Sequence, residues 1–396
     1  MLVFVVALAI PATVRASPQD LFGYGDRSAA MGSTGVAHAV GSEAAYSNPA
    51  LLSITRQRTL SLGIHAAAFR LSIDDAPFPI DPGRANTIGV ALPVPVRGPL
   101  ADRLTLGAAF FTPHAVVVRG QVLYPDEPQF PVLQYRAQSV ALMAAFGFGP
   151  VEGFRFGAGF SALASLLGDM SVALNAEGRF GSTVETQLIA TFAPLAGVSY
   201  ERGPLRVGAV VRGALDARFD FFVLTADLPI RLPPLTVGGV AQYDPFIAAV
   251  EGALTVGPWL FSAHLTYKRW SDYPGTQQRT SESSREPPSP GFSDTLVPRF
   301  GVERAFGPPE ARVAFLRAGL FWEPSPAPEA RPEALYLDAD RIALTFGGGI
   351  DLHVAGDLHL RLDGHVQLHW MPPRDTGPAS IDGAVTTAGW RVEASW

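Results

Sequence analysis

Three of the eight histidines stand at a spacing that would bring them to one side of a strand. His359, His365 and His369 are separated by even numbers of residues, so in a β-strand their side chains share a face. Imidazole nitrogens are common metal ligands, but His365 and His369 would lie about 13 Å apart at the rise of a strand. One ion cannot span that distance without ligands from other segments. The pattern favours solvated polar side chains, and we predict no metal site.

Ser262 and His264 form the close pair that could act as a nucleophile and its base, because residues two apart in a strand point the same way. No acid in the neighbouring sequence is placed to orient His264, and the chain has no Gly-x-Ser-x-Gly turn. We therefore predict no catalytic residues, no cofactor and no enzyme activity.

Two kinds of side chain could contact a ligand. Lys268 and Arg317 could hold a carboxylate, as could Arg361, although charges also line polar interiors without any ligand. Apolar side chains gather in two other stretches, and the residues predicted to contact a hydrophobic ligand are Leu166, Leu167, Phe219, Phe221, Phe222 and Leu224. A dense exposed apolar patch is costly unless it binds something or packs against neighbouring loops, and both explanations remain open.

The elements that position these residues are predicted to be strands. The 396-residue chain is 47% apolar and 17% charged, yet after its N-terminus it has no run of about 18 uncharged apolar residues. Forty Gly and 35 Pro are spread along it and punctuate many short elements. The absence of Cys excludes disulfides and thiolate metal sites, and a net charge of −6 without a basic stripe argues against nucleic acid as a partner.

Short and long connections alternate between the predicted strands. The short ones run from Pro95 to Asp102, Gly149 to Gly153, Glu201 to Pro204, Gly257 to Pro258, Gly307 to Ala311 and Val354 to Gly356. The long ones lie near 71–85, 113–136, 168–188, 215–245, 271–296, 323–340 and 371–387. Thirteen connections imply fourteen strands, and short turns at one end with long loops at the other are typical of a bacterial outer-membrane barrel.

Apolar and polar residues alternate in 341–353, 357–370 and 388–396, which suits a wall with lipid on one face and water on the other. A soluble sheet with one wet face is the alternative. Aromatic residues near strand ends are expected to form interfacial girdles: Trp259, Tyr267, Trp270, Trp322 and Trp370. Trp396 ends the closing strand, and we expect the barrel assembly machinery to recognise it.

An export signal is predicted at the N-terminus. Leu2 to Ile10 is a short apolar stretch, and Val14-Arg15-Ala16 has the small-x-small form that signal peptidase accepts, although no basic residue precedes the stretch. We expect residues 1–16 to be a signal peptide.

Several segments resemble the outer-membrane long-chain fatty-acid transporter family, also called FadL-like, which includes proteins for other hydrophobic compounds. They are residues 22–37 and 44–52 near the N-terminus, and Tyr267-Lys268-Arg269-Trp270-Ser271, Val297-Pro298-Arg299-Phe300-Gly301-Val302-Glu303, Leu316 to Leu320, Pro324 to Pro328 and Leu337 to Arg341 further along. Their order, more than any one of them, makes the match specific.

The resemblance implies an all-β fold, a 14-stranded antiparallel transmembrane β-barrel (residues 55–396) whose N-terminal segment, 17–54, folds inside as a hatch or plug. Gly32 and Gly35 would allow tight turns there, and Asn48 with Pro49 would redirect the chain into the first strand. A flexible Gly-Ala leader is the alternative.

For function, the resemblance implies passive uptake of a hydrophobic small molecule in the outer membrane of a Gram-negative bacterium, with capture by a groove between the third and fourth long loops. Fatty acids are the first expectation and aromatic hydrocarbons the second. A non-transporting structural or adhesive barrel is the alternative from another class. We expect a monomer in contact with outer-membrane lipid.

Overall fold

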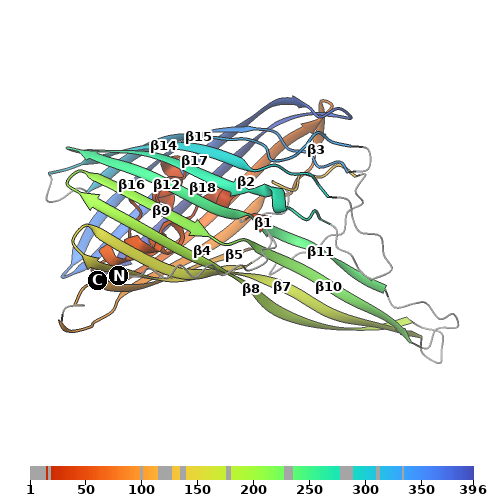
Figure 1. The fold of residues 1–396 in the computed structure, drawn as a ribbon, viewed down its shortest axis with the longest axis horizontal. Helices are drawn as coiled ribbons and strands as arrows, with labels where there is room; N and C mark the ends of the chain where they lie inside the picture. Colours follow the sequence, from red (N-terminus) through yellow and green to blue (C-terminus); the bar gives the residue numbers. More distant parts are fainter. Residues whose placement is uncertain are drawn as a thin grey trace, which may run out of the picture.

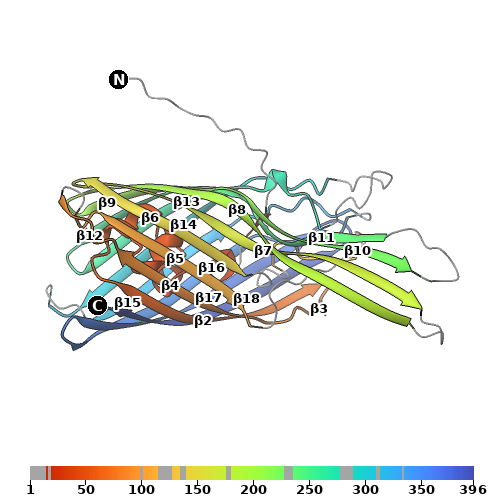
Figure 2. The same cartoon turned by 90° about the horizontal axis from the view of Figure 1, so that it is seen from below.

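The computed structural model describes residues 15–16, 19–98, 101–114, 127–133, 140–174, 180–226, 235–276, 289–308, 313–331 and 334–396. Its main feature is a closed ring of fourteen antiparallel strands, as the count of connections predicted (Figures 1 and 2). In ring order the strands are β2 (Thr59–Ile73), β4 (Gly83–Pro93), β5 (Leu104–Pro113), β6 (Ala141–Val151), β7 (Phe154–Leu174), β8 (Phe180–Arg202), β9 (Leu205–Arg212), β12 (Phe246–Val256), β13 (Trp259–Arg269), β14 (Thr295–Phe306), β15 (Ala314–Glu323), β16 (Arg341–Ala355), β17 (Leu358–Asp375) and β18 (Ser380–Ser395).

The ring closes where β18 pairs with β2, in a register that runs from Ser395 opposite Thr59 to Ile381 opposite Ile73. Backbone bonds between Arg58 and Trp396, at 3.0 and 3.1 Å, extend this pairing by one residue. Since every ring strand then has two neighbours, the wall has no open edge, which a structure in hydrocarbon requires. Recognition of Trp396 by an assembly machinery stays a prediction.

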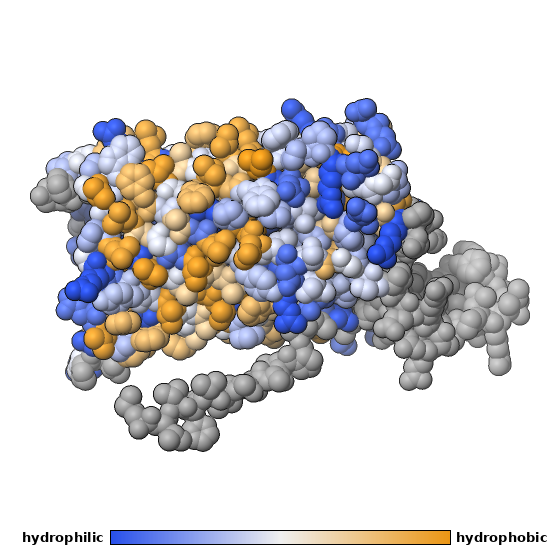
Figure 3. All heavy atoms as spheres, turned by 45° about the horizontal axis from the view of Figure 1, so that its top comes forward, coloured by the Kyte–Doolittle hydropathy of each residue, from blue (hydrophilic) through white to orange (hydrophobic). Residues whose placement is uncertain are grey.

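Side chains alternate across this wall as the sequence predicted. On β16, Ile342, Leu344 and Phe346 are 41%, 49% and 51% exposed on the outside, whereas Thr345 is fully buried on the inside. Figure 3 shows hydrophobic residues gathered over the strands, with hydrophilic residues more frequent toward the loop end. A soluble sheet would bury its apolar face and expose its polar face to water, which is the opposite of this pattern. The ring is therefore a membrane-spanning barrel. No helix in the described ranges is long and apolar enough to cross a membrane.

Of the residues predicted to form the aromatic girdle, Trp259, Trp322 and Trp370 are exposed on the outside, where a girdle would lie. The prediction was wrong at Trp270, which is 2% exposed. Trp270 begins the short 3-10 helix η4 (Trp270–Asp272) and continues the inward face of β13, which carries His264 and Lys268. Its ring stacks on Tyr243 with 5.2 Å between ring centroids.

Two predicted long loops are also wrong in part, because strands occupy much of 168–188 and 215–245. β7 and β8 stay paired to Leu174 opposite Phe180, and β10 (Leu215–Ala226) pairs with β11 (Leu235–Asp244). Figures 1 and 2 show these four strands extending past the others at one end. The remaining strands are β1 (Arg15–Ala16), paired with β11, and β3 (Ala76–Phe78), paired with β2.

The strand pairing changes after β9. Gly213 and Ala214 separate β9 from β10, and Pro245 separates β11 from β12. β9 pairs with β8, but β10 pairs in parallel with β7, with Phe219 opposite Leu166. The hairpin of β10 and β11 therefore lies outside the fourteen-strand ring, and β10 pairs with the projecting part of β7.

The alternating connections predict opposite membrane sides for Ala355, the last residue of β16, and Ala379, in the loop before β18. A single Cys replacing Ala379 is expected to react with an impermeant maleimide on intact cells, whereas one replacing Ala355 is expected to react only after cell disruption, since long loops face outward. The chain has no other Cys to give background labelling. Equal labelling of both on intact cells would contradict the orientation.

Candidate functional site

Residues 21–54, which we call the inner segment, lie inside the ring (Figure 1, red to orange). Its helices are α2 (Asp26–Ala30), η1 (Gly41–Glu43), α3 (Ala44–Ser47) and η2 (Pro49–Ile54), and α1 (Gln19–Phe22) leads into it. α2 contacts β15 to β18, while η2 contacts β5 to β8 on the other side of the ring. The N-terminal segment is therefore not a free leader but a packed part of the barrel interior.

Glycines let the inner segment touch the wall. A Cβ on Gly319 of β15 would lie 2.2 Å from the nitrogen of Gly32, and one on Gly32 would lie 2.5 Å from the carbonyl oxygen of Phe300. Gly32 and Gly35 have φ of +72° and +147°, conformations that a side chain disfavours, as the predicted tight turns require. Backbone thus packs directly on backbone at this contact.

Asn48 and Pro49 turn the chain toward the first strand. The Asn48 side-chain amide donates to the carbonyl oxygens of Val36 at 2.8 Å and Val198 at 3.0 Å, and its oxygen accepts from the backbone of Ala50 at 3.1 Å. Pro49 then starts η2. The pair therefore joins the inner segment to β8 as well as directing the chain.

Buried ion pairs hold the first helix of the inner segment. The Arg27 guanidinium donates twice to the Glu303 carboxylate, at 2.8 Å each, and donates to the carbonyl oxygen of His38 at 2.7 Å. Glu303 also accepts from Arg317 at 2.6 Å, and Arg317 pairs with Asp363 at 2.7 Å. A single network of charges therefore runs from the inner segment across β14, β15 and β17.

Glu251 of β12 makes a second attachment. Its carboxylate accepts from the backbone N–H groups of Gly35 and Val36, both at 2.7 Å, and from His264 Nδ1 at 2.9 Å. His38 Nε2 lies 3.3 Å from its other oxygen. One buried carboxylate thus joins two backbone donors and two imidazoles.

The expectation that no acid orients His264 is wrong, because Glu251 faces it across the β12–β13 pair. The other ring nitrogen of His264 lies 2.6 Å from Thr266 Oγ1, while Ser262 Oγ has no hydrogen-bond partner among the described residues. Ser262 and His264 are therefore not hydrogen-bonded to each other in this structure. Glu251 itself was missed, although an acid among the apolar residues of 246–256 is a signal that could have found it.

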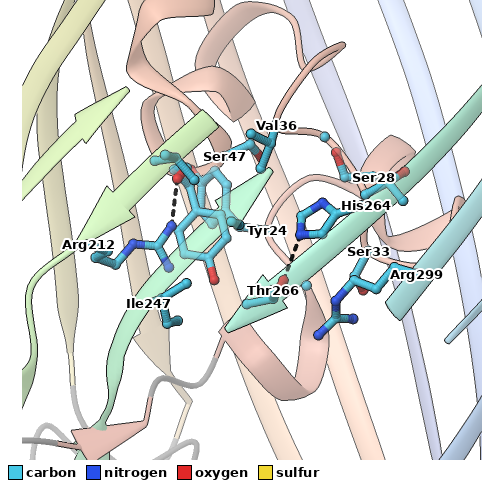
Figure 4. A pocket seen from close by; sticks show the side chains of 16 residues that line it. Tyr24, Ser28, Ser33, Val36, Ser47, Arg212, Ile247, His264, Thr266 and Arg299 are labelled. Atoms are coloured by element: carbon cyan, nitrogen blue, oxygen red, sulfur yellow. Dashed lines mark hydrogen bonds between the residues drawn. The ribbon is translucent and has the colours of Figure 1, made fainter. Parts of the chain in front are cut away.

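A cavity of about 70 Å³ lies between the inner segment and strands β9, β12, β13 and β14 (Figure 4). Its lining combines apolar residues, such as Val36, Val210 and Ile247, with Arg212 and Arg299. Arg212 donates to the carbonyl oxygen of Tyr46 at 2.8 Å, and its guanidinium lies 4.1 Å from the centre of the Tyr46 ring. Its Nε is buried and has no hydrogen-bond partner in the described part of the chain. This pocket can accept one anionic oxygen beside apolar groups.

A larger apolar region lies toward the end with long loops, and we call it the upper cluster. It joins inward side chains of many strands to residues of the inner segment and of two loops: Leu21, Phe22, Ala67, Leu71, Ala85, Phe111, Phe130, Leu133, Ala141, Leu163, Ala193, Leu215, Ala217, Ala330, Leu337, Ala339, Met371, Ile381 and Val385. All are buried. The barrel interior is therefore apolar above the inner segment, whereas both ion pairs and apolar contacts surround the inner segment itself.

No protein-family model matches the chain, and no curated protein matches it. Several solved structures match its fold. A crystal structure of a Pseudomonas aeruginosa FadL homologue is 13% identical, with a TM-score of 0.64, and the match covers 98% of this chain and 98% of that chain. The Pseudomonas putida toluene transporter TodX is 16% identical, with a TM-score of 0.56, and the match covers 94% of this chain and 98% of that one. The Ralstonia pickettii toluene transporter TbuX is also 16% identical, with a TM-score of 0.57 and coverage of 94% and 98%.

This chain has the FadL-type barrel fold. At these identities the likeness concerns architecture, so what the side chains of this FadL-type barrel do must come from its own geometry.

The FadL-type barrel brings together the two apolar stretches predicted to contact a ligand. The backbone of β10 from Phe219 to Leu224 runs beside that of β7 from Leu166. The residues involved are Leu166, Leu167, Phe219, Phe221, Phe222 and Leu224, and their role as a capture surface stays a prediction.

The two predicted ligand-binding cations face the interior but are already paired. Lys268 donates to Glu323 at 2.6 Å and is fully buried, and Arg317 belongs to the network of Arg27 and Glu303. Their role toward a ligand stays a prediction. Arg212, which the sequence interpretation missed, has the unpartnered atom instead, and its position at the end of an apolar stretch (Val207 to Val211) was the available signal.

Proposed function

We propose that this protein is an outer-membrane channel of a Gram-negative bacterium for passive movement of hydrophobic small molecules, with the inner segment as its hatch. The observation that carries the proposal is the upper cluster. The interior of a membrane barrel is ordinarily polar, because it holds water. An apolar interior between the outer loops and a tightly held inner segment suits a hydrophobic cargo.

The capture step is part of the same proposal. A hydrophobic molecule would first meet the projecting strands β7 and β10, whose apolar stretches run side by side. It would then enter the upper cluster, where Phe22 of the inner segment packs against Phe111 of the wall with 5.9 Å between ring centroids. From there the inner segment blocks the way, since it packs against strands on both sides of the ring. Passage therefore requires the inner segment to move.

Two ligand classes fit this route. The unpartnered Nε of Arg212 favours a ligand with a carboxylate, so we propose fatty acids as the first class. The similar structures named for toluene transport favour aromatic hydrocarbons as the second. Arg212 distinguishes these two ligand classes, because a hydrocarbon has no charged group that a guanidinium could bind.

Replacing Arg212 with glutamine separates the two classes. A hydrogen bond to a charged group contributes about 1.5–3 kcal/mol, so oleate binding to the purified barrel is expected to weaken by about tenfold or more. Toluene binding is expected to stay unchanged. The matched control is Arg206→Gln on the same strand, because Arg206 pairs with Glu201 near the turn to β8, outside the pocket. Equal effects on both ligands would contradict a carboxylate site.

Uptake by cells tests the channel itself. Cells lacking their own transporters and expressing this barrel are expected to take up labelled oleate or toluene faster than cells expressing an unrelated outer-membrane barrel. Heat-modifiable migration of the purified protein reports that the barrel is folded. Folded protein without any gain in uptake of either ligand would move the preference to the structural or adhesive reading.

A further inference from the structure

Three ionisable residues from separate elements meet beside the upper cluster. Asp26 comes from α2 of the inner segment, His65 from β2 and His365 from β17. Each offers one possible ligand atom, and these atoms all lie within 4.8 Å of one another. The residues are 0%, 2% and 4% exposed, respectively. The group is therefore shielded from bulk water.

Each of the three residues keeps one polar atom unused. His365 Nδ1 lies 2.8 Å from Asp26 Oδ1, and His65 Nε2 lies 3.0 Å from Thr87 Oγ1. Within the described ranges, His65 Nδ1, His365 Nε2 and Asp26 Oδ2 have no hydrogen-bond partner. If the two bonded nitrogens carry the protons, all three unused atoms are acceptors. Buried acceptors left without a donor or cation destabilise a fold by about 1–3 kcal/mol each.

A glycine leaves space between the three groups. A Cβ on Gly389 of β18 would lie 2.5 Å from His65 Nδ1, 2.7 Å from His365 Cε1 and 3.0 Å from Asp26 Oδ1. The two imidazoles and the carboxylate therefore converge on the point where any other residue would place its side chain.

We propose that Asp26, His65 and His365 bind a divalent transition-metal ion of the zinc class. Two imidazoles with one carboxylate, and a further position open, form a donor set that such ions take in proteins. The ion would take the place of the proton between His365 Nδ1 and Asp26 Oδ1. Metal bonds of about 2.0–2.2 Å would need the side chains to draw together, with ligand atoms about 3.3 Å apart. Thr87 would hold the His65 ring by the nitrogen that does not face the ion, the usual arrangement around a metal-bound histidine.

The surrounding charges allow a cation there. The nearest cation is Arg391 of β18, whose guanidinium lies 3.6–3.8 Å from carboxylate oxygens of Glu43, Asp363 and Glu393. These three carboxylates balance the charge of Arg391, so the Asp26 carboxylate remains available to bind the ion.

The ion would tie the inner segment to the wall on both sides of the closing strand, since β18 lies between β2 and β17. The sequence prediction of no metal site considered His365 only beside His359 and His369. Asp26 and His65 precede His365 by 339 and 300 residues along the chain, although His365 and Asp26 are in direct contact.

The test measures zinc on the purified full-length barrel. After chelator treatment and incubation with Zn²⁺, gel filtration and elemental analysis are expected to find about one ion per folded chain. Asp26→Asn, His65→Asn and His365→Asn are expected to lower zinc affinity by about tenfold or more. The control is His359→Asn, which removes one member of an exposed pair with His353, 3.4 Å apart, and is expected to leave this binding unchanged.

A second readout is hydrogen exchange of residues 21–54, which zinc is expected to slow in the parent protein and in His359→Asn but not in Asp26→Asn. Asp26→Asn can keep its hydrogen bond to His365, so it separates loss of the ion from loss of the fold. A folded parent barrel that retains no zinc overturns the proposal, as does binding that His359→Asn abolishes and the other three variants keep. No transport ligand is involved, so the result is independent of the channel assignment.

Discussion

Glu251→Gln is expected to release the inner segment and make the barrel leaky. The carboxylate accepts hydrogen bonds from Gly35, Val36 and His264 through one oxygen, Oε2, in a buried site, and glutamine offers only an uncharged oxygen there while its amide group replaces the oxygen that lies beside His38. Hydrogen bonds to a charged group contribute about 1.5–3 kcal/mol each, so loss of the charge on an acceptor that three donors share weakens this attachment. The equilibrium between attached and released inner segment should therefore shift by about tenfold or more.

Ion conductance across a planar bilayer is the measurement. The parent barrel is expected to conduct rarely, and Glu251→Gln is expected to show frequent large openings. Glu152→Gln is the matched control, because Glu152 is exposed in the turn between β6 and β7 and makes no hydrogen bond or ion pair with the described residues of the inner segment. If Glu251→Gln conducts no more than this control, Glu251 does not hold the inner segment in place.

A disulfide between the inner segment and the wall is expected to stop uptake. A Cβ on Gly107 of β5 would lie 3.2 Å from the Cβ of Ala45 in α3, close to the 3.5–4.5 Å of a disulfide. The nearest obstacle is the end of the Leu52 side chain, which can turn aside. In the double variant Ala45→Cys, Gly107→Cys, oxidation should fix the inner segment and reduce ligand uptake to the level of cells without the barrel.

Reduction of the same sample should restore uptake, which separates tethering from misfolding. Each single Cys variant serves as a control, and the absence of native Cys removes competing pairs. Unchanged uptake with a fully formed disulfide would mean that cargo passes without movement of this part of the inner segment.

The wall was predictable from sequence because each of its residues faces either lipid or the interior. Alternation at Ile342, Leu344 and Phe346, and the short turns between strands, are local signals, and they gave the strand number and the inward faces. The ends of β7, β8, β10 and β11 were not predictable, because parallel pairing of Phe219 with Leu166 is a contact between distant segments. The buried position of Trp270 was predictable, because Trp270 is two residues after Lys268 and shares its inward face.

The interior was less predictable than the wall. Lys268 and Arg317 were correctly placed on the inward face, but the sequence does not show that Glu323, Glu303 and Asp363 lie opposite them. Asp26 and Arg27 stand out in retrospect as charges within a Gly- and Ala-rich segment. Their partners His365 and Glu303 are brought to them by the closure of the ring, which no local pattern encodes.

The ring closes between β18 and β2, two strands from opposite ends of the sequence. β18 follows every other ring strand along the chain, so until it is made the wall keeps two bare strand edges, on β2 and on β17. His365 and Arg391, which meet the inner segment on this side, belong to the same late strands. Translation that stops before β18 therefore leaves an open sheet that lipid cannot accommodate, together with an N-terminal segment that lacks part of its wall contacts.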